Sequence, residues 1–181
     1  MARMEHYCLM IKSGGEESFK KDFEENLKKA AINSAKITFF KKKMRNSKKI
    51  EFEQPLFPGY CFLSVEKMDA KIAEAAKKSK NFYHFLDNNT DIKRLQGKDK
   101  EILSNLLKFG ETQGISTVSF DENQKITVSK GPLMGFEGKI IKVNRKRGRA
   151  TIRIDLCNNE MRFDLAFDEL AATQRPDTCK S

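Results

Sequence analysis

Apolar side chains at helical spacing predict three helices. In residues 16–32 lysines and glutamates separate apolar positions that recur every fourth residue, namely Phe19, Phe23 and Leu27. This spacing puts the apolar residues on one face of an amphipathic helix. Ser13 followed by Glu16 predicts a capping box at its start. Shorter helices are predicted around residues 69–80 and 98–109, the latter ending at Gly110.

Alternating or continuous apolar runs predict strands. The run HYCLMI, residues 6–11, is typical of a short buried strand, and residues 37–40 and 60–65 are also β-prone. From residue 126 onward the pattern changes to short strands with strict alternation, most clearly at 150–156 and 161–165, separated by glycine- and asparagine-containing turns. Several short strands within about fifty residues favour a small closed barrel.

The change of pattern predicts two domains. Residues 110–123, GETQGISTVSFDEN, are polar and lack helical periodicity. We therefore expect an N-terminal α/β domain over 1–109, a flexible linker over 110–122, a β-domain over 123–172 and a disordered tail over 173–181. The basic run KKKMRNSKK, residues 41–49, has six positive charges in nine residues and is interpreted as a mobile hairpin loop.

Composition narrows the class of partner. The chain of 181 residues has 39% apolar and 33% charged residues, a net charge of +10 and a pI near 9.4. A strongly basic protein favours polyanionic partners such as DNA or RNA, although a solvated basic surface gives the same balance. No apolar run approaches the roughly 20 residues of a membrane helix, so a cytoplasmic protein without a membrane partner is expected.

Candidate catalytic and metal-binding patterns are weak. The four cysteines, at positions 8, 61, 157 and 179, form no close pair, and only two histidines could join them. Zinc sites usually take about four ligands in close pairs, so reduced cysteines acting as small apolar residues are expected and no metal or cofactor is predicted. The glycine-rich and nucleophile motifs of common enzymes are not found, and the protein is predicted not to be an enzyme.

Two segments carry more specific information. The run QPLFPGYCFLSVE, residues 54–66, places Phe57 and Tyr60 around a Pro58-Gly59 turn before an apolar strand. Aromatic residues at a rigid turn suit either a docking surface or a buried core.

The second segment is KGPLMGFEGKIIKVNRKRGRATIRI, residues 130–154. It contains turns at Gly131, Pro132 and Gly138, and residues 139–154 hold seven Lys or Arg and no acid. Long cations beside one turn can follow phosphates, which favours nucleic-acid contact over an edge hairpin kept soluble by charge. The candidate contact residues are Lys142, Arg145, Lys146, Arg147 and Arg149.

Both segments resemble one family. The sequence KGPLMGFEGKIIKVNRKRGRATIRIDL resembles a KOW motif, and PLFPGYCFLSVE resembles the strand-entry signature of the NusG N-terminal (NGN) domain. Together with the opening HYCLMIKSGGEE, they follow the order of the NusG family over almost the whole chain. The resemblance implies an α+β fold: an NGN-type antiparallel sheet with flanking helices, a linker and a small SH3-like β-barrel.

The resemblance also implies a function in transcription elongation, antitermination or termination. In the family the NGN domain docks on the clamp helices of the largest RNA polymerase subunit and discourages pausing. The residues that carry over to that contact are Tyr7, Phe57, Pro58, Gly59 and Tyr60. RNA or DNA is the expected partner of the KOW barrel, and a monomer is expected.

The sequence departs from general members of the family at two places, and these bear on whether it resembles a general factor or a specialised paralogue. General members carry Phe-Gly in a barrel loop that is offered to Rho and to a ribosomal protein, whereas Cys157-Asn158 stands here, which speaks against those partners. The segment NRKRGRA, residues 144–150, is more basic than in general members and resembles specialised paralogues such as LoaP or RfaH. The strict alternation in 150–156 and 161–165 favours a constitutive barrel.

A rival interpretation from another class is a KOW-containing ribosomal or ribosome-assembly protein that binds structured RNA. The segment FPGY, residues 57–60, distinguishes the two, because such a protein needs no NGN domain.

Overall fold

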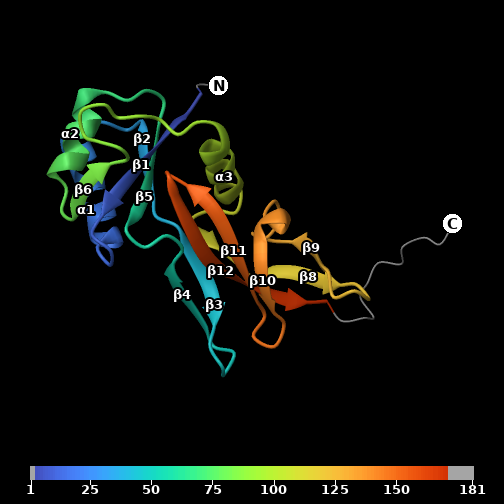
Figure 1. The fold of residues 1–181 in the computed structure, drawn as a ribbon. Coiled ribbons are helices and arrows are strands. Elements are labelled where there is room, and N and C mark those ends of the chain that lie inside the picture. Colours follow the sequence, from blue (N-terminus) through green and yellow to red (C-terminus); the bar gives the residue numbers. More distant parts are fainter. Residues whose placement is uncertain (1–2, 171–181) are drawn as a thin grey trace. The chain divides into compact units, whose positions relative to one another are not determined.

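The computed structural model describes residues 3–170, and the chain divides into two compact units that interleave along the sequence (Figure 1). Unit 1 contains residues 3–41, Pro55–Ser104 and Asp155–Asn159. Unit 2 contains Lys42–Gln54, Asn105–Ile154 and residues 160–170. The basic segment near residue 45 therefore groups with the C-terminal strands, which the sequence did not predict.

Unit 1 is built on a four-stranded antiparallel sheet in the order β2-β5-β1-β6. Two helices accompany it. The elements are β1 (Glu5–Ile11), α1 (Glu16–Lys29), β2 (Ala35–Thr38), β5 (Tyr60–Val65), α2 (Ala70–Lys78) and β6 (Phe82–Phe85). Figure 1 shows α1 and α2 together beside the sheet, and α2 packs on α1 and β6.

The core of unit 1 follows from the periodicities of the sequence. The predicted stripe of α1 is buried, and its Phe19 and Phe23 rings stack with centroids 5.7 Å apart. These rings join the odd-numbered residues of β1 and β5, including Leu9 and Leu63, in one apolar cluster. Alternate side chains of a strand point to opposite faces, so this set occupies one face of the sheet.

The start of α1 differs from the predicted capping box. Gly15 is the N-cap and no side chain caps the helix. The carboxylate of Glu16 is buried and instead accepts a hydrogen bond from the backbone N–H of Gly59, at 2.8 Å. Glu16 therefore fixes a turn 43 residues further along the chain.

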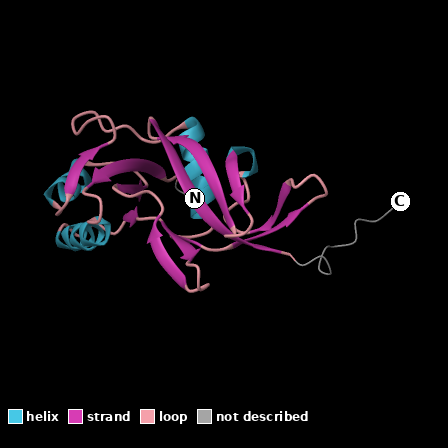
Figure 2. Ribbon diagram, turned by 60° about the horizontal axis from the view of Figure 1, so that its bottom comes forward, coloured by secondary structure: helices cyan, strands magenta, loops and turns pink. Residues whose placement is uncertain are grey.

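Unit 2 is built mostly of strands, drawn in magenta in Figure 2. A five-stranded sheet has the order β10-β11-β12-β8-β9, and a three-stranded sheet has the order β4-β3-β7. The elements are β3 (Lys41–Arg45), β4 (Glu51–Pro55), β7 (Thr112–Gln113), β8 (Ser116–Phe120), β9 (Ile126–Lys130), the 3₁₀ turn η1 (Glu137–Lys139), β10 (Ile140–Asn144), β11 (Arg149–Leu156) and β12 (Asn159–Glu169). The boundary between the units falls within α3 (Gly97–Leu107) and near the ends of β3, β4, β11 and β12. The predicted α+β class is confirmed.

Two predicted loops are strands. The segment expected as a flexible linker, 110–122, contains β7 and β8, and β8 pairs with β9 and, in parallel, with β12. Its alternation is hidden because buried Ser116 precedes buried Val118 and Phe120. The basic segment expected to be mobile contains β3, in which Lys42 and Met44 are buried between half-buried neighbours. The predicted tail, 173–181, lies outside the described residues.

Within residues 3–170 no helix is long and apolar enough to cross a membrane. No group of three or more His, Cys, Asp or Glu side chains in the same residues is arranged to hold a metal ion. The three described cysteines, Cys8, Cys61 and Cys157, are buried free thiols.

Candidate functional site

The Pro-Gly turn of residues 55–60 is held by the strand and helix beside it. Gly59 has a φ of 83°, which favours glycine, and a Cβ there would lie 3.3 Å from the carbonyl oxygen of Ile11. The Ile11 N–H donates to the Gly59 carbonyl at 2.9 Å, and the Gly59 N–H donates to Glu16. The turn is therefore rigid and sets the direction in which β5 begins.

Phe57 lies inside the fold. Its side chain is 4% exposed and makes edge contacts with Phe40 and Phe62, at centroid distances of 6.4 and 6.0 Å. Edge-to-face packing of this kind is a stabilising feature of protein cores. Pro58, in contrast, is exposed. The structure thus separates the predicted site residues into a buried support and an exposed turn.

Tyr60 is the aromatic residue of the turn that reaches the surface. It is half-buried, and its hydroxyl oxygen accepts a weak hydrogen bond from Asn159 Nδ2 at 3.4 Å. Burial raises the pKa of its hydroxyl, and the neighbouring Cys8 and Cys157 thiols act in the same direction. The strand register pairs Tyr60 with Met10, which is also half-buried. Met10 and Tyr60 therefore share one face of the sheet.

Tyr7 is not brought to that face. It pairs with Leu63 on β5, three residues from Tyr60, so the two tyrosines point to opposite faces of the sheet. Tyr7 is 4% exposed, and its hydroxyl donates to the Glu5 carboxylate at 2.8 Å. Burial first, and then this hydrogen bond, raise the pKa of Tyr7 to about 12.

The tip of the β11–β12 hairpin, Asp155–Asn159, belongs to unit 1. Cys157 and Asn158 have φ values of 54° and 61°, the left-handed conformation that two-residue hairpin turns require. Cys157 is buried against Cys8, and this thiol contact, together with burial, raises the pKa of Cys8 well above its usual value. Cys157 and Asn158, which stand where general family members carry Phe-Gly, thus form a hairpin turn with the Cys157 side chain buried.

The predicted cations of the basic hairpin have different environments. Lys142, Lys146 and Arg147 are exposed. Arg145 is already engaged, because its guanidinium pairs with Glu169, contacts the Gln124 side chain and stacks on the Phe120 ring at 4.3 Å. Arg149 is half-buried, and its Nη2 donates to the Arg45 carbonyl oxygen at 2.8 Å.

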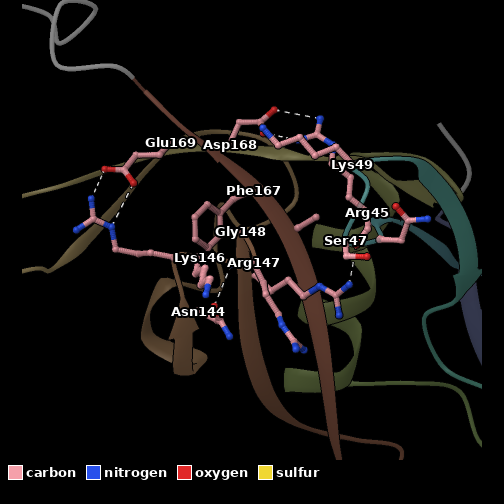
Figure 3. A pocket seen from close by; sticks show the side chains of 14 residues that line it. Arg45, Ser47, Lys49, Asn144, Lys146, Arg147, Gly148, Phe167, Asp168 and Glu169 are labelled. Carbon is pink, nitrogen blue, oxygen red and sulfur yellow. Dashed lines mark hydrogen bonds and ion pairs between the residues drawn. The ribbon is translucent and has the colours of Figure 1, made fainter.

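Four of these five cations border a groove of about 780 Å³ within unit 2, which we call the two-hairpin groove (Figure 3). One wall is the β3–β4 turn and the other is the β10–β11 turn. Its lining residues are Arg45, Asn46, Ser47 and Lys49, then Asn144 to Arg149, and Ala166 to Glu169 of β12. Lys142 is not among them. The groove therefore joins the two basic segments of the sequence, which are about a hundred residues apart.

Asparagines fix both turns of the groove. Asn46 Oδ1 accepts from the backbone N–H groups of Lys48 and Ile50, at 2.9 and 3.0 Å, and Asn144 Oδ1 accepts from the Arg147 N–H at 3.0 Å. Gly148, with a φ of 59°, lets the second turn approach β12, because a Cβ there would lie 2.7 Å from the Phe167 carbonyl oxygen. The cations of both turns are thus presented on ordered backbone.

The predicted turn residues of the barrel also differ in their surroundings. Gly131 has a φ of 101°, and a Cβ there would come within 2.6 Å of the Ser116 Cα, so the position requires glycine. Pro132 is buried, whereas a Cβ on Gly138 would meet open space. Gly131 and Pro132 therefore shape the entry to η1, and Gly138 tolerates a larger residue.

The sequence of residues 4–104 matches the family model described as transcription termination factor NusG, and residues 122–153 match the KOW motif. The chain belongs to the NusG family. Its fold is also similar to that of a solved structure concerned with domain interaction in Thermotoga maritima NusG, with a TM-score of 0.58 and 17% identity over 91% of this chain and 94% of that one.

Two curated relatives extend the similarity over most of the chain. The transcription termination/antitermination protein NusG of Neisseria meningitidis serogroup B is 22% identical over 171 residues, covering 91% of this chain and 95% of the relative. The protein of the same name from Rickettsia bellii is 21% identical over 169 residues, covering 91% and 87%. The predicted family is therefore confirmed, and its members with these names are transcription factors.

Within this NusG fold, sequence reasoning missed three residues or segments at the candidate sites. Met10 stands beside Tyr60, as strand pairing shows but local pattern does not. Glu16 was assigned to a helix cap rather than to the turn at Gly59. The β3–β4 hairpin was predicted as a basic segment, but its place beside β10–β11 depends on long-range folding. The residues of β3 show no alternating apolar pattern, because one of its two buried positions is a lysine, Lys42.

Proposed function

We propose that this NusG-family chain is a transcription elongation factor that binds RNA polymerase and promotes processive elongation and antitermination. In this proposal the turn of residues 57–60 docks on the clamp helices of the largest polymerase subunit, and the KOW barrel contacts nucleic acid. The observation that carries the docking proposal is the rigid turn that leaves Tyr60 half-exposed beside Met10.

The contact residues have distinct roles. Tyr60, with exposed Pro58 and half-buried Met10, forms the apolar contact surface, and an aromatic anchor fixed by a rigid turn loses little conformational entropy on binding. Phe57 supports the turn from the core, and Gly59 allows its backbone conformation. Tyr7 stabilises the sheet from its other face. Asn159 donates a weak hydrogen bond to the Tyr60 hydroxyl, and a bound helix that contacts the hydroxyl would replace it.

The nucleic-acid part of the proposal rests on the exposed cations Lys142, Lys146 and Arg147. These side chains can approach phosphates without losing existing ion pairs, since no described acidic residue pairs with them. The basic 144–150 segment favours nucleic acid over a protein partner for this end of the barrel. The match of residues 4–104 to the NusG model speaks against the alternative of a ribosomal KOW protein.

Titration of core RNA polymerase with Tyr60→Ala, Tyr60→Phe and Tyr83→Ala tests the docking proposal. Loss of the ring should weaken binding by about 1–3 kcal/mol, or roughly 5- to 150-fold. Tyr60→Phe keeps the ring and should bind like wild type. Tyr83 is an exposed tyrosine on β6 and serves as the matched control. A folded Tyr60→Ala protein with unchanged affinity for polymerase would refute the assignment.

The activity itself is tested by single-round transcription through a strong pause. Wild-type protein should shorten the dwell time at the pause, and Tyr60→Ala should need a proportionally higher concentration for the same effect. An unchanged dwell time at saturating wild-type protein would contradict a role in processive elongation.

A further inference from the structure

The two-hairpin groove has a surplus of positive charge that its own acids do not neutralise. Six cationic side chains line it, and the acids among its lining residues are Asp168 and Glu169. Asp168 pairs with Arg45 and Glu169 pairs with Arg145 (Figure 3). No described residue forms an ion pair with Lys49, Lys146 or Arg147. The groove therefore keeps unpaired cations on both of its walls.

The two walls are connected by Arg149. Its Nη2 donates to the Arg45 carbonyl oxygen, while its Nε is buried and has no hydrogen-bond partner among the described residues. A buried N–H of a guanidinium is costly to leave unpaired. Arg149 therefore adds positive charge behind the two turns, and the case for an anionic ligand rests on the exposed cations Lys49, Lys146 and Arg147.

The acid–arginine pairs also have a positioning role. The hydrogen bond to the Asp168 carboxylate, and after it the one to Glu51, raise the pKa of the Arg45 guanidinium. Arg45 and Arg145 are therefore held against β12 by Asp168 and Glu169, which are adjacent residues of that strand. Lys146 and Arg147 extend from the turn beside Gly148 and remain available to a ligand.

We propose that the two-hairpin groove binds the phosphodiester backbone of a single nucleic-acid strand, with the β3–β4 and β10–β11 turns contacting successive phosphates. The proposal deepens the proposed nucleic-acid role of the barrel by adding a second binding element, the β3–β4 turn, that the KOW motif does not contain. A positively charged groove that follows the backbone is one of the two components of single-strand sites, the other being aromatic residues on which bases stack.

The lining predicts how the strand is recognised. Phe167 is the aromatic residue among the lining positions, and its ring is buried. The groove therefore offers phosphate contacts without an exposed stacking platform for bases. Binding should depend steeply on salt, because counterions are released from the strand, and only weakly on base sequence.

The test uses the full chain and fluorescein-labelled 20-nucleotide strands of mixed sequence, titrated at several KCl concentrations. Four variants are compared with wild type: Lys49→Gln on one wall, Arg147→Gln on the other, the double variant, and Lys130→Gln as a control. Lys130 is an exposed lysine of β9 in the same unit that does not line the groove.

Each single groove substitution should lower affinity by about 3- to 10-fold at low salt and reduce the log–log salt slope by about 0.7. The double variant should reduce the slope by about 1.4, and Lys130→Gln should leave it unchanged. RNA and DNA strands of equal sequence and their duplexes are measured in parallel. Single strands should bind more tightly than duplexes. If the affinities for RNA and DNA differ, the nucleic acid that binds more tightly is the preferred ligand of the groove.

Three results would overturn the proposal. An unchanged slope for Lys49→Gln beside a reduced one for Arg147→Gln would limit binding to the β10–β11 hairpin. Tighter binding of duplex than of single strand would exclude the single-strand groove, and salt-independent binding would exclude phosphate contact. Polymerase affinity is measured separately through Tyr60, so failure of the groove and failure of the docking proposal give different results.

Discussion

The Pro-Gly turn and the two-hairpin groove both contain segments of unusual composition, but the turn buries one of its characteristic side chains and the groove exposes several of its own. Phe57 of the turn is buried in an aromatic cluster and leaves Tyr60 as the ring at the surface. Lys49, Lys146 and Arg147 of the groove are all exposed. An aromatic residue suits both a core and an interface, whereas charged side chains mostly stay at the surface, although Lys42 of the same basic run is buried. Composition therefore located most of the exposed cations of the groove, but it did not show which aromatic residue of the turn is exposed.

The same contrast separates stability from binding. Substitutions in the turn remove packing contacts inside unit 1, so most of them should lower the free energy of unfolding. Substitutions of the exposed groove cations remove no described ion pair, so their effects should be confined to ligand binding. The following predictions test this division.

The largest expected effect is on core packing. Phe57→Ala should lower the free energy of unfolding by about 3–5 kcal/mol, because it leaves a cavity between Phe40 and Phe62. Phe52→Ala is the control, since Phe52 on β4 is 41% exposed and should change stability by less than about 1 kcal/mol. Urea denaturation of both variants measures the difference. If Phe57→Ala and Phe52→Ala lower the free energy of unfolding equally, the burial of Phe57 would be contradicted.

The next effect concerns the backbone of the groove. Gly148→Ala should cost about 1–3 kcal/mol, because its φ is positive and its Cβ would collide with the Phe167 carbonyl oxygen. Gly138→Ala is a matched control, as a Cβ there meets open space. Thermal unfolding distinguishes the two variants. A Gly148→Ala protein as stable as wild type would mean that the turn does not need its close approach to β12.

A smaller effect is expected at alkaline pH. Burial and the Glu5 hydrogen bond raise the pKa of Tyr7 to about 12, so the native state holds this proton more tightly than the unfolded chain does. The resulting stability is fully present below about pH 10 and is lost as the pH rises towards 12. Tyr7→Phe should flatten the stability profile between pH 10 and 12. A profile identical to that of wild type would show that Tyr7 is not the group that titrates.

The smallest effect is expected for the groove cations. Lys146→Gln and Arg147→Gln should each change the free energy of unfolding by less than about 0.5 kcal/mol, because exposed side chains without ion pairs contribute little to stability. Chemical denaturation at two salt concentrations measures this. A loss of more than about 1 kcal/mol would indicate that these residues are structural.

The sequence predicted the elements whose apolar periodicity is regular. The stripe of Phe19, Phe23 and Leu27 identified α1 because each turn of the helix repeats the pattern, and the alternation of Ile152 and Ile154 identified β11. It failed where polar residues occupy buried positions. Ser116 concealed β8 and Lys42 concealed β3, since their burial depends on partners distant in the sequence.

The candidate sites were predictable in part for the same reason. Local sequence identified the Pro58-Gly59 turn and the cations of 142–149. It could not show that Tyr7 faces away from Tyr60, or that Met10 takes the place beside it, because strand register is set by the whole sheet. Nor could it assemble two distant basic hairpins into one groove.

The most direct test of the central claim, that polymerase and nucleic acid bind through different residues, is a crossed binding measurement. Wild type, Tyr60→Ala and the double variant Lys146→Gln/Arg147→Gln are each titrated with core RNA polymerase and with a labelled single strand. Tyr60→Ala should lose roughly 5- to 150-fold in affinity for polymerase and keep its affinity for the strand. The double variant should keep polymerase binding and show a salt slope for the strand that is lower by about 1.4. Parallel losses of both affinities in either folded variant would contradict the claim.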